Sequence, residues 1–440
     1  MNHPGASPGS GPIAVIGLGY VGLPLALSFA RQGRTVVGVE TDPEVRSSLA
    51  AGRPRFHEPG VAELLREQLG ERFTVAAQPP SWPDAVVICV GTAVDPETKR
   101  PNLAHLRAAV DDIAPRLDDD TLVVVRSTVP VGTTRKLVRA RLRDRGVDPL
   151  LAFCPERTIQ GRAMAELSEL PQVIGAIDER SLARAKELYA PVAPDQVPVS
   201  SPEAAELVKL VCNAHTDLIY GFGNEVALIA EALGVDASEV IASANLRYPR
   251  PDLCRPGYVG GSCLTKDPYL LAHSAEEAGY HPPMVAAARE VNERVPRAAV
   301  QHVLAALATA GRSVKDAKVL VCGVAYKGHP ETDDVRGSAA IDVVRLLGGR
   351  VAELAGHDYV VGAEPTARIG LTPASLDEGM ADADALMVLV DHPRYTREIT
   401  AEAVRARMRP SATVVDIWGV LEDELGALPD VNYRRLGNGR

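Results

Sequence analysis

The amino-acid sequence predicts an α/β protein in which two doubly wound parallel-sheet domains are joined by a helical spine. Apolar strand-like runs alternate with helical stretches near both ends of the chain, which is typical of parallel sheets. The segment between them has a long helical periodicity instead. Aromatic residues make up only 4% of the 440 residues, and small aliphatic side chains suit strands packed between helices. We expect a flexible tail at 1–11 and three parts at 12–201, 202–312 and 313–440.

The first part contains four apolar runs that we expect to be strands, at Ile13–Ile16, Thr35–Val39, Ala85–Val90 and Leu122–Val125. Helical stretches are expected between and after these strands, at Leu23–Arg31, Val61–Gln68, Leu103–Arg116 and Thr133–Arg143. This alternation predicts a parallel sheet with helices on both faces.

The middle part begins with Pro202 and nearby acidic residues, a composition that favours the first turn of a helix. The apolar period that follows predicts a helix reaching about Leu233, and a second helix is expected over Met284–Ala310. Between them, the Pro- and Gly-rich stretch Tyr248–Ser262 is expected to form an irregular loop.

The last part resumes the alternation. Strands are expected at Lys318–Cys322, Val351–Leu354, Ala385–Val390 and Thr413–Ile417, with a helix at Ser338–Leu347. The run Lys318–Gly323 resembles Pro12–Gly17, but the glycine-rich loop that follows the first run is degraded after the second. We therefore expect two related sheet domains, of which only the first keeps that loop.

Composition and charge exclude several classes of protein. The net charge of −10 argues against a broad nucleic-acid surface, so a phosphate ligand must be met by a few local cations or helix ends. No apolar run approaches ~20 residues and the N-terminus does not resemble a signal peptide, so we expect a cytoplasmic chain without a membrane span. The six cysteines form no C-x-x-C pair, which argues against a metal site and suggests a reducing compartment.

A glycine-rich loop, Gly17-Leu18-Gly19-Tyr20-Val21-Gly22, lies between the first expected strand and the first helix. Such a loop lets the backbone approach a pyrophosphate at the helix N-terminus, which predicts dinucleotide binding. Glu40 ends the next strand, where its carboxylate would accept hydrogen bonds from ribose hydroxyls and favour NAD over NADP. The alternative is a turn whose glycines serve packing alone.

Other polar residues follow later strands, at the edge where open α/β sheets bind ligands. Thr92 and Thr128 belong to this group, although either could simply cap a helix. Glu156 also follows an expected strand. Lys209 and Asn213 lie four residues apart on the spine helix, so they share a face and could stabilise an oxyanion, or form an ordinary solvated pair.

The stretch Gly257–Pro268 places Cys263 after several glycines and before an expected helix start, with Lys266 and Asp267 close behind. A thiol at a helix N-terminus beside a lysine is expected to have a lowered pKa and to act as a nucleophile. The alternative is a buried cysteine in a glycine-rich turn. The other five cysteines are interpreted as small hydrophobic residues.

Together these motifs resemble the UDP-glucose/GDP-mannose dehydrogenase family of nucleotide-sugar 6-dehydrogenases, over about Pro12 to Gly419. The resemblance rests on the glycine loop with Leu23-Pro24-Leu25-Ala26, Ser127-Thr128-Val129-Pro130-x-Gly132-Thr133-Thr134, Pro155-Glu156-Arg157, Glu206-x-x-Lys209-Leu210-x-x-Asn213, Asn224-Glu225, Gly260-Gly261-Ser262-Cys263-x-x-Lys266-Asp267, Ala325-Tyr326-Lys327-Gly328 and Asp333-Asp334-x-Arg336-x-Ser338.

The resemblance implies an NAD-binding Rossmann domain, a helical spine carrying the contact of a homodimer or higher homo-oligomer, and a Rossmann-like nucleotide-sugar domain. It implies oxidation of a sugar C6 hydroxymethyl to a carboxylate with two NAD per sugar, in uronic acid and polysaccharide biosynthesis. It also implies a substrate that is a UDP-sugar. Residues implied to bind the cofactor are Gly17, Gly19, Tyr20, Val21, Gly22, Glu40, Thr92, Thr128 and Lys266.

The family mechanism, carried over, gives a role to each catalytic residue. Lys209 and a water on Asp267 would help remove the first proton, and Cys263 would attack the aldehyde to give a thiohemiacetal and then a thioester. Lys209 and Asn213 would stabilise the oxyanion. A water activated by Glu156, held with Thr128 and Asp267, would hydrolyse the thioester.

Substrate binding is implied for nine residues: Glu156, Arg157, Lys209, Asn213, Arg250, Tyr258, Gly260, Lys327 and Arg336. Among these, Arg336 matches an arginine that faces the nucleotide diphosphate, and Lys327 is a second candidate there. Arg250 resembles an arginine that reaches the sugar site of a neighbouring subunit, with Arg247 as the alternative.

The stretch from Cys154 to Arg162, Tyr248-Pro249-Arg250 and Lys266-Asp267-Pro268-Tyr269 resemble the branch that acts on UDP-N-acetylhexosamines, notably UDP-N-acetylmannosamine. UDP-glucose and GDP-mannose remain alternative substrates. One departure is that Ala214-His215-Thr216-Asp217 lacks the Tyr-Arg pair common in that branch. A two-electron hydroxyacid dehydrogenase and a non-catalytic binding regulator are the rival interpretations of the whole chain.

Overall fold

The computed structural model describes residues 11–438. The expected flexible tail at 1–11 therefore lies outside the described residues, except for Gly11. Contacts divide the chain into two compact units: the first runs to Cys212 and includes Tyr269–His281, and the second comprises Asn213–Pro268 and everything from Pro282 onward.

The first unit is built on an eight-stranded sheet with the order β10-β9-β8-β7-β4-β1-β2-β3. Its strands are β1 (Ile13–Ile16), β2 (Val36–Val39), β3 (Phe73–Ala76), β4 (Ala85–Ile88), β7 (Leu122–Val125), β8 (Leu150–Phe153), β9 (Gln172–Ala176) and β10 (Gln196–Val199). The pairs from β3 to β8 are all parallel, whereas β9 runs antiparallel to β8. The order β3-β2-β1-β4-β7-β8 is the doubly wound order of dinucleotide-binding folds.

Helices cover both faces of this sheet because alternate residues of each buried strand face opposite cores. Ile13 and Val15 of β1 pack into one apolar cluster, and Ala14 and Ile16 pack into the other. The helices and short segments of this unit are α1 (Gly22–Arg31), α2 (Pro43–Ala50), α3 (Val61–Gln68), β5 (Ala93–Val94), β6 (Pro101–Asn102), α4 (Ala104–Ile113), a π-helix (Thr134–Arg139), α5 (Ala140–Asp144), α6 (Ala163–Glu169) and α7 (Glu179–Tyr189).

The second unit contains a six-stranded parallel sheet with the order β13-β12-β11-β14-β15-β16. Its strands are β11 (Lys318–Cys322), β12 (Glu353–His357), β13 (Thr372–Pro373), β14 (Ala385–Val388), β15 (Thr413–Asp416) and β16 (Asn432–Arg435). Counted along the chain, this order repeats that of the six strands β3-β2-β1-β4-β7-β8 of the first sheet. The two Rossmann-like, doubly wound domains predicted from the sequence are thereby confirmed.

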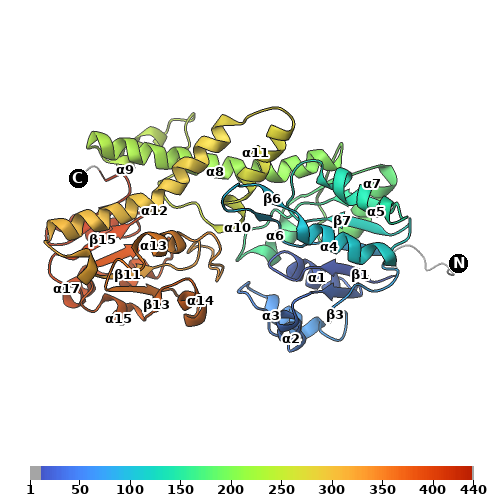
Figure 1. The fold of residues 1–440 in the computed structure, drawn as a ribbon, viewed down its shortest axis with the longest axis horizontal. Coiled ribbons are helices and arrows are strands. Elements are labelled where there is room, and N and C mark those ends of the chain that lie inside the picture. The colour runs from blue at the N-terminus through green and yellow to red at the C-terminus, as the bar shows by residue number, and fades with distance from the viewer. Residues whose placement is uncertain (1–10, 439–440) are drawn as a thin grey trace. The chain divides into compact units, whose positions relative to one another are not determined.

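Figure 1 shows α12 and α13 on one side of the second sheet and α15 on the other. Val319 and Val321 of β11 face the first of these helical layers, and Leu320 and Cys322 face the second. The helices are α9 (Ala237–Asn245), α10 (Gly261–Leu264), α12 (Pro283–Thr309), α13 (Ala339–Leu347), α14 (Ala363–Arg368), α15 (Leu376–Met380), α16 (Tyr395–Glu398), α17 (Ala401–Arg407) and α18 (Glu422–Leu425).

The predicted spine is present as α8 (Pro202–Leu233), a helix of 32 residues, and α12, of 27 residues. The boundary between the units falls within α8, after Cys212, and α11 (Asp267–Glu277) also contributes to both units. The predicted middle segment 202–312 is thus divided between the two units by its contacts.

Two expected elements differ in detail. The strand expected at Val351–Leu354 is β12, Glu353–His357, because the N–H groups of Ala352 and Glu353 both donate to Ala317 O and pairing with β11 starts only there. The helix expected at Thr133–Arg143 begins as a π-helix and becomes α-helical at Ala140.

Candidate active site

The glycine loop after β1 leaves open space where the pyrophosphate of a dinucleotide would lie. Gly17 has φ +92°, and a Cβ at Gly22 would lie only 1.8 Å from Gly17 O, so both positions require glycine. A Cβ at Gly19 would meet nothing within 4 Å. The first residues of α1 have no side-chain cap, so backbone N–H groups at this end are left for an anion.

Glu40 lies beside this loop at the end of β2. One carboxylate oxygen accepts the N–H of Leu18 at 3.2 Å, and the other accepts the N–H of Asp42 at 3.1 Å. The side chain is half-buried and therefore fixed near the glycine loop while still accessible to a ribose.

Two more predicted cofactor residues adjoin the same strands. Thr92 follows β4, the strand next to β1, and its buried hydroxyl lacks a hydrogen-bond partner among the described residues. The ring of Tyr20 packs on Phe56 with centroids 4.4 Å apart. An open anion site, a fixed carboxylate and an orphaned hydroxyl around the switch point between β1 and β4 fit NAD.

Glu156, after β8, is held by a buried arginine that sequence analysis missed. Arg126, directly after β7, donates through Nε to Glu156 Oε2 at 3.1 Å and through Nη2 to the same oxygen. The backbone N–H groups of Arg157 and Thr158 donate to Oε1 at 2.7 and 2.8 Å. Burial alone would raise the pKa of Glu156, but Arg126, the Thr158 N–H and the charge of Lys209 outweigh it and lower that pKa.

Lys209 and Glu206 lie one turn apart on α8 and are both buried. The charge of Lys209 is one of the causes that lower the pKa of Glu156. Glu206 accepts the N–H groups of Gly132 and Thr134, which anchors the segment that carries Thr128. Burial raises the pKa of Glu206 to about 7. Thr128 itself is half-buried in the loop after β7.

Cys263 is exposed and is the third residue of the four-residue helix α10. The helix expected to start just after the cysteine is α11, which begins at Asp267, and Gly261, with φ +89°, begins the short turn that contains the cysteine itself. The Gly261 N–H donates to Gly337 O at 3.1 Å, which places the cysteine loop against the residue that follows Arg336. A helix this short has only a small dipole, so stabilisation of a Cys263 thiolate must come from neighbouring side chains.

Asp267 binds two other predicted site residues, Asn213 and Lys266, within the second unit. Its fully buried carboxylate accepts the amide of Asn213 at 2.5 Å and the ammonium of Lys266 at 2.6 Å. Asn213 on α8 is thus tied to the segment that follows Cys263. Glu156, Thr128 and Lys209 belong to the first unit, and Asn213, Cys263 and Asp267 belong to the second.

The predicted substrate residues show different environments. Tyr258 is buried and donates its hydroxyl to Asp342 at 3.3 Å, and burial raises its pKa. Arg336 is 58% exposed and binds Asp334 through Nε and Nη2, which presents a fixed guanidinium. Lys327 lies over the ring of Tyr326, and Arg250 lies exposed over that of Tyr248.

The two remaining predicted substrate residues lie one in each unit. Arg157 is exposed and donates to Pro171 O at 3.4 Å. Gly260 approaches the Arg336 segment so closely that a Cβ there would lie 2.6 Å from Gly337 O. His215, on α8, is exposed, as a helix-surface residue would be.

The other cysteines fit the hydrophobic interpretation with one exception. Burial raises the pKa of Cys89 and of Cys154 to about 12, and burial also raises the pKa of Cys322 well above its usual value. Burial also raises the pKa of half-buried Cys254. The prediction is wrong for Cys212, which is exposed on α8.

Trp418 packs in the second unit, where it contacts the loop before Cys263. A side chain at position 257 would collide with its ring at 2.4 Å, and its indole donates to Leu389 O at 3.1 Å. The ring therefore supports the loop that leads to Cys263. A nearby buried network was also missed: Arg289 binds Asp217 and donates to Leu264 O at 3.3 Å.

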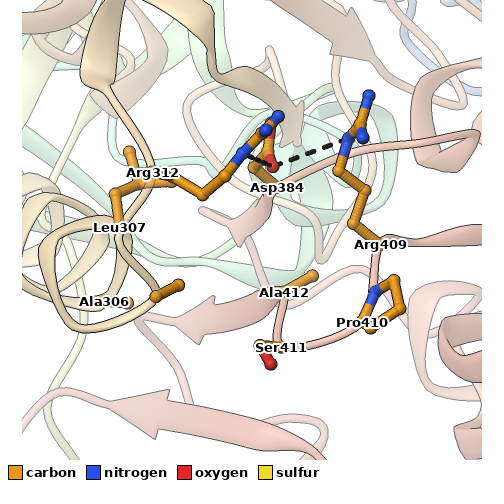
Figure 2. A pocket seen from close by; sticks show the side chains of 9 residues that line it. Ala306, Leu307, Arg312, Asp384, Arg409, Pro410, Ser411 and Ala412 are labelled. Atoms are coloured by element: carbon orange, nitrogen blue, oxygen red, sulfur yellow. Dashed lines mark hydrogen bonds and ion pairs between the residues drawn. The ribbon is translucent and has the colours of Figure 1, made fainter.

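A cavity of about 220 Å³ lies elsewhere in the second unit, at the end of α12. Figure 2 shows Arg312 and Arg409 converging on Asp384 at its wall. Asp384 also accepts the N–H of Lys318 at the start of β11, so this cluster anchors the sheet at the edge opposite the ligand-binding strand ends. None of the predicted site residues lines it.

Within residues 11–438, no helix combines the length and apolar character required to cross a bilayer. Among known proteins, the sequence matches all three domains of the UDP-glucose/GDP-mannose dehydrogenase family: the NAD binding domain over residues 12–193, the central domain over 203–294 and the UDP binding domain over 320–423.

Relatives cover nearly the whole chain. It is 34% identical to the UDP-N-acetyl-D-mannosamine dehydrogenase of Pyrococcus horikoshii, over 97% of this chain and 99% of the relative. A solved structure of UDP-D-ManNAc dehydrogenase from that organism superimposes with a TM-score of 0.86 at 32% identity, covering 97% of this chain and 99% of the other. A UDP-glucose dehydrogenase of Pyrobaculum islandicum gives 0.83 at 31% identity, covering 99% and 100%.

These matches agree with the two doubly wound sheets and with the dinucleotide site built around Gly17–Gly22 and Glu40. The chain belongs to the UDP-glucose/GDP-mannose dehydrogenase family and is an NAD-dependent nucleotide-sugar dehydrogenase.

Proposed function

We propose that the chain oxidises the C6 hydroxymethyl group of a UDP-N-acetylhexosamine, with UDP-N-acetylmannosamine as the preferred substrate, to a carboxylate. The observation that carries this proposal is the exposed Cys263 on a glycine-rich loop, followed by the Asn213–Asp267–Lys266 cluster. A hydroxyacid dehydrogenase would need no such nucleophile, and a binding regulator would need neither the cysteine nor the lysine.

NAD would be held by the glycine loop, Tyr20, Val21, Glu40, Thr92, Thr128 and Lys266, and it supplies the hydride acceptor for both oxidations. The chain's own groups manage protons and charge. Lys209 and a water held by Asp267 take the hydroxyl proton in the first oxidation.

Cys263 provides covalent catalysis. Its thiolate forms a bond to the aldehyde carbon, and the resulting thiohemiacetal loses a hydride to become a thioester. Lys209 and Asn213 stabilise the oxyanion by charge and by an amide N–H. A water activated by Glu156 and held with Thr128 and Asp267 then attacks the thioester. The C–S bond breaks, the thiolate is restored and the acid leaves as a carboxylate.

The nucleotide diphosphate would be bound by Arg336, whose guanidinium is fixed by Asp334, with Lys327 nearby in sequence. Tyr258 is buried, so it would stabilise the substrate site through its hydrogen bond to Asp342. Arg157, Gly260 and Arg250 complete the proposed substrate residues, with Arg250 reaching the site of a neighbouring subunit.

The sugar is assigned from the relatives and from the Cys154–Arg162 stretch. UDP-glucose is the second candidate, because the Pyrobaculum islandicum UDP-glucose dehydrogenase is almost equally similar in fold. His215 and Thr216 stand where the N-acetylhexosamine branch commonly has a Tyr-Arg pair, so the proposed pocket does not use that pair.

We also propose a cytoplasmic homodimer with domains at 12–201, 202–312 and 313–440, working in polysaccharide biosynthesis. Phe222, Ile229 and Leu233 support the dimer, because they are 53%, 54% and 72% exposed on one face of α8. Apolar side chains exposed in such a row favour contact with a second subunit.

The test is to incubate the purified enzyme and NAD with UDP-ManNAc, UDP-GlcNAc, UDP-glucose and GDP-mannose, and to follow NADH and product mass. We expect UDP-ManNAc to give the highest kcat/KM and a product heavier by the change from CH2OH to carboxylate. Cys263→Ser should abolish acid formation, whereas Cys212→Ser, at another exposed thiol, should not. Acid formation by Cys263→Ser at the wild-type rate would refute the thioester mechanism.

A further inference from the structure

We infer that Arg126 is a positioning residue that fixes the Glu156 carboxylate, in one orientation and in its charged form, for hydrolysis of the thioester. The inference rests on the proposed function and assigns a role to a residue that no motif above includes. Arg126 is 2% exposed at the carboxyl end of β7, and Glu156 is 8% exposed after the neighbouring strand β8.

The guanidinium cannot move independently of the surrounding sheet. Nη1 donates to Cys154 O at 3.2 Å and to Gln172 Oε1 at 2.9 Å, and Tyr189 lies against it with its ring centroid 5.6 Å from Cζ. Gln172, on β9, donates in turn to Pro155 O at 3.1 Å and to Val173 O at 2.9 Å. The arginine and the glutamine together hold the backbone on which Glu156 stands.

The carboxylate of Glu156 is correspondingly saturated. It accepts Nε and Nη2 of Arg126 on one oxygen and the N–H groups of Arg157 and Thr158 on the other. An ionised carboxylate offers about four lone-pair sites, and these four donors engage them. A reacting water must therefore share an occupied oxygen, so the geometry and basicity that it meets are set by Arg126.

Burial makes the arginine necessary for the charge. A carboxyl group removed from water favours its protonated form unless opposite charge and donors compensate. Without the guanidinium, two backbone N–H groups and Lys209 would remain. Glu156 would then take up a proton at a higher pH, and its side chain would lose the contact that orients it.

The test uses Arg126→Met, Arg126→Lys and Glu156→Gln in the full-length enzyme. Acyl-enzyme on Cys263 is followed by rapid quench and intact mass, from about pH 5.5 to about pH 9. We expect Arg126→Met to form the thioester normally and to hydrolyse it roughly tenfold or more slowly near neutrality, recovering as the pH rises. Arg126→Lys should recover part of the rate of thioester hydrolysis, because a lysine restores the positive charge but not the two-nitrogen geometry of the guanidinium.

Arg141→Met is the matched control, because it removes a half-exposed arginine paired with Asp111 in the same unit. It should leave both the rate and the pH profile unchanged. If Arg126→Met does not fold, Gln172→Leu tests the same anchor and should shift the pH profile in the same direction by less.

The outcomes separate this inference from the function on which it rests. One outcome would overturn the role of Arg126 alone. In it, acyl-enzyme accumulates in Glu156→Gln but not in Arg126→Met, and the acid side of the pH–rate profile is unshifted in Arg126→Met. The absence of acyl-enzyme from both variants, with normal acid formation, would overturn the hydrolysis mechanism itself and the inference with it.

Discussion

At the scale of single residues, the site depends on a few side chains held by backbone donors. Glu40 shows this most simply, since its carboxylate bridges Leu18 of the glycine loop and Asp42 at the start of α2. The same oxygens suit the two ribose hydroxyls of the adenosine half of NAD and repel a 2′-phosphate.

Glu40→Ala should weaken NADH binding by roughly ten- to a hundredfold, the cost of losing hydrogen bonds to a charged acceptor. It should also narrow the preference for NAD over NADP, because the repulsive charge is gone. Fluorescence titration with NADH and NADPH measures both effects. Glu44→Ala, at an exposed carboxylate on α2, serves as the control, and an unchanged NADH Kd in Glu40→Ala would refute the ribose assignment.

Some site residues could be predicted from the sequence and others could not. Glycine positions, Glu40 and Cys263 were identifiable because their chemistry depends on short local patterns. Arg126 was not, because its partners Glu156, Gln172 and Tyr189 come from distant parts of the chain. The available signal was a charged residue directly after a fully apolar strand, since a charge at such a place is normally paired.

At the scale of elements, long and strongly periodic segments were predictable. The strands at Ile13–Ile16 and Leu122–Val125 and the helix α8 have the expected bounds. The edge strand β10 was missed, because Gln196 and Pro198 interrupt its apolar pattern. Helix α2 was missed although Asp42 caps it and Pro43 begins it, which is a recognisable start signal.

Helix α8 carries the proposed dimer contact, and a charge there tests it. Ile229→Glu should convert the dimer to a monomer, because a buried unpaired carboxylate is strongly disfavoured in an apolar interface. Light scattering coupled to size-exclusion chromatography measures the mass directly. Glu239→Lys, at an exposed polar position on α9, should leave the mass unchanged. A wild-type chain that is monomeric, or an Ile229→Glu variant that stays dimeric, would contradict the proposal.

At the scale of the whole molecule, two sheets share one strand order but differ in their loops. Gly17–Gly22 keeps the open dinucleotide loop after β1, whereas β11 leads into the segment containing Lys327 and Arg336. This difference was visible in the sequence, because Lys318–Gly323 repeats the strand of Pro12–Gly17 without the glycines that follow. The chain has a net charge of −10, and Lys209, Lys266 and Arg336 are local positive charges within it.

We propose that one enzyme carries out both oxidations while the aldehyde stays bound to Cys263. The most direct measurement is the ratio of NADH formed to UDP-sugar consumed in a complete reaction, with an aldehyde trap present. We expect two NADH per sugar and no trapped aldehyde. One NADH per sugar, or release of the aldehyde to the trap, would contradict it.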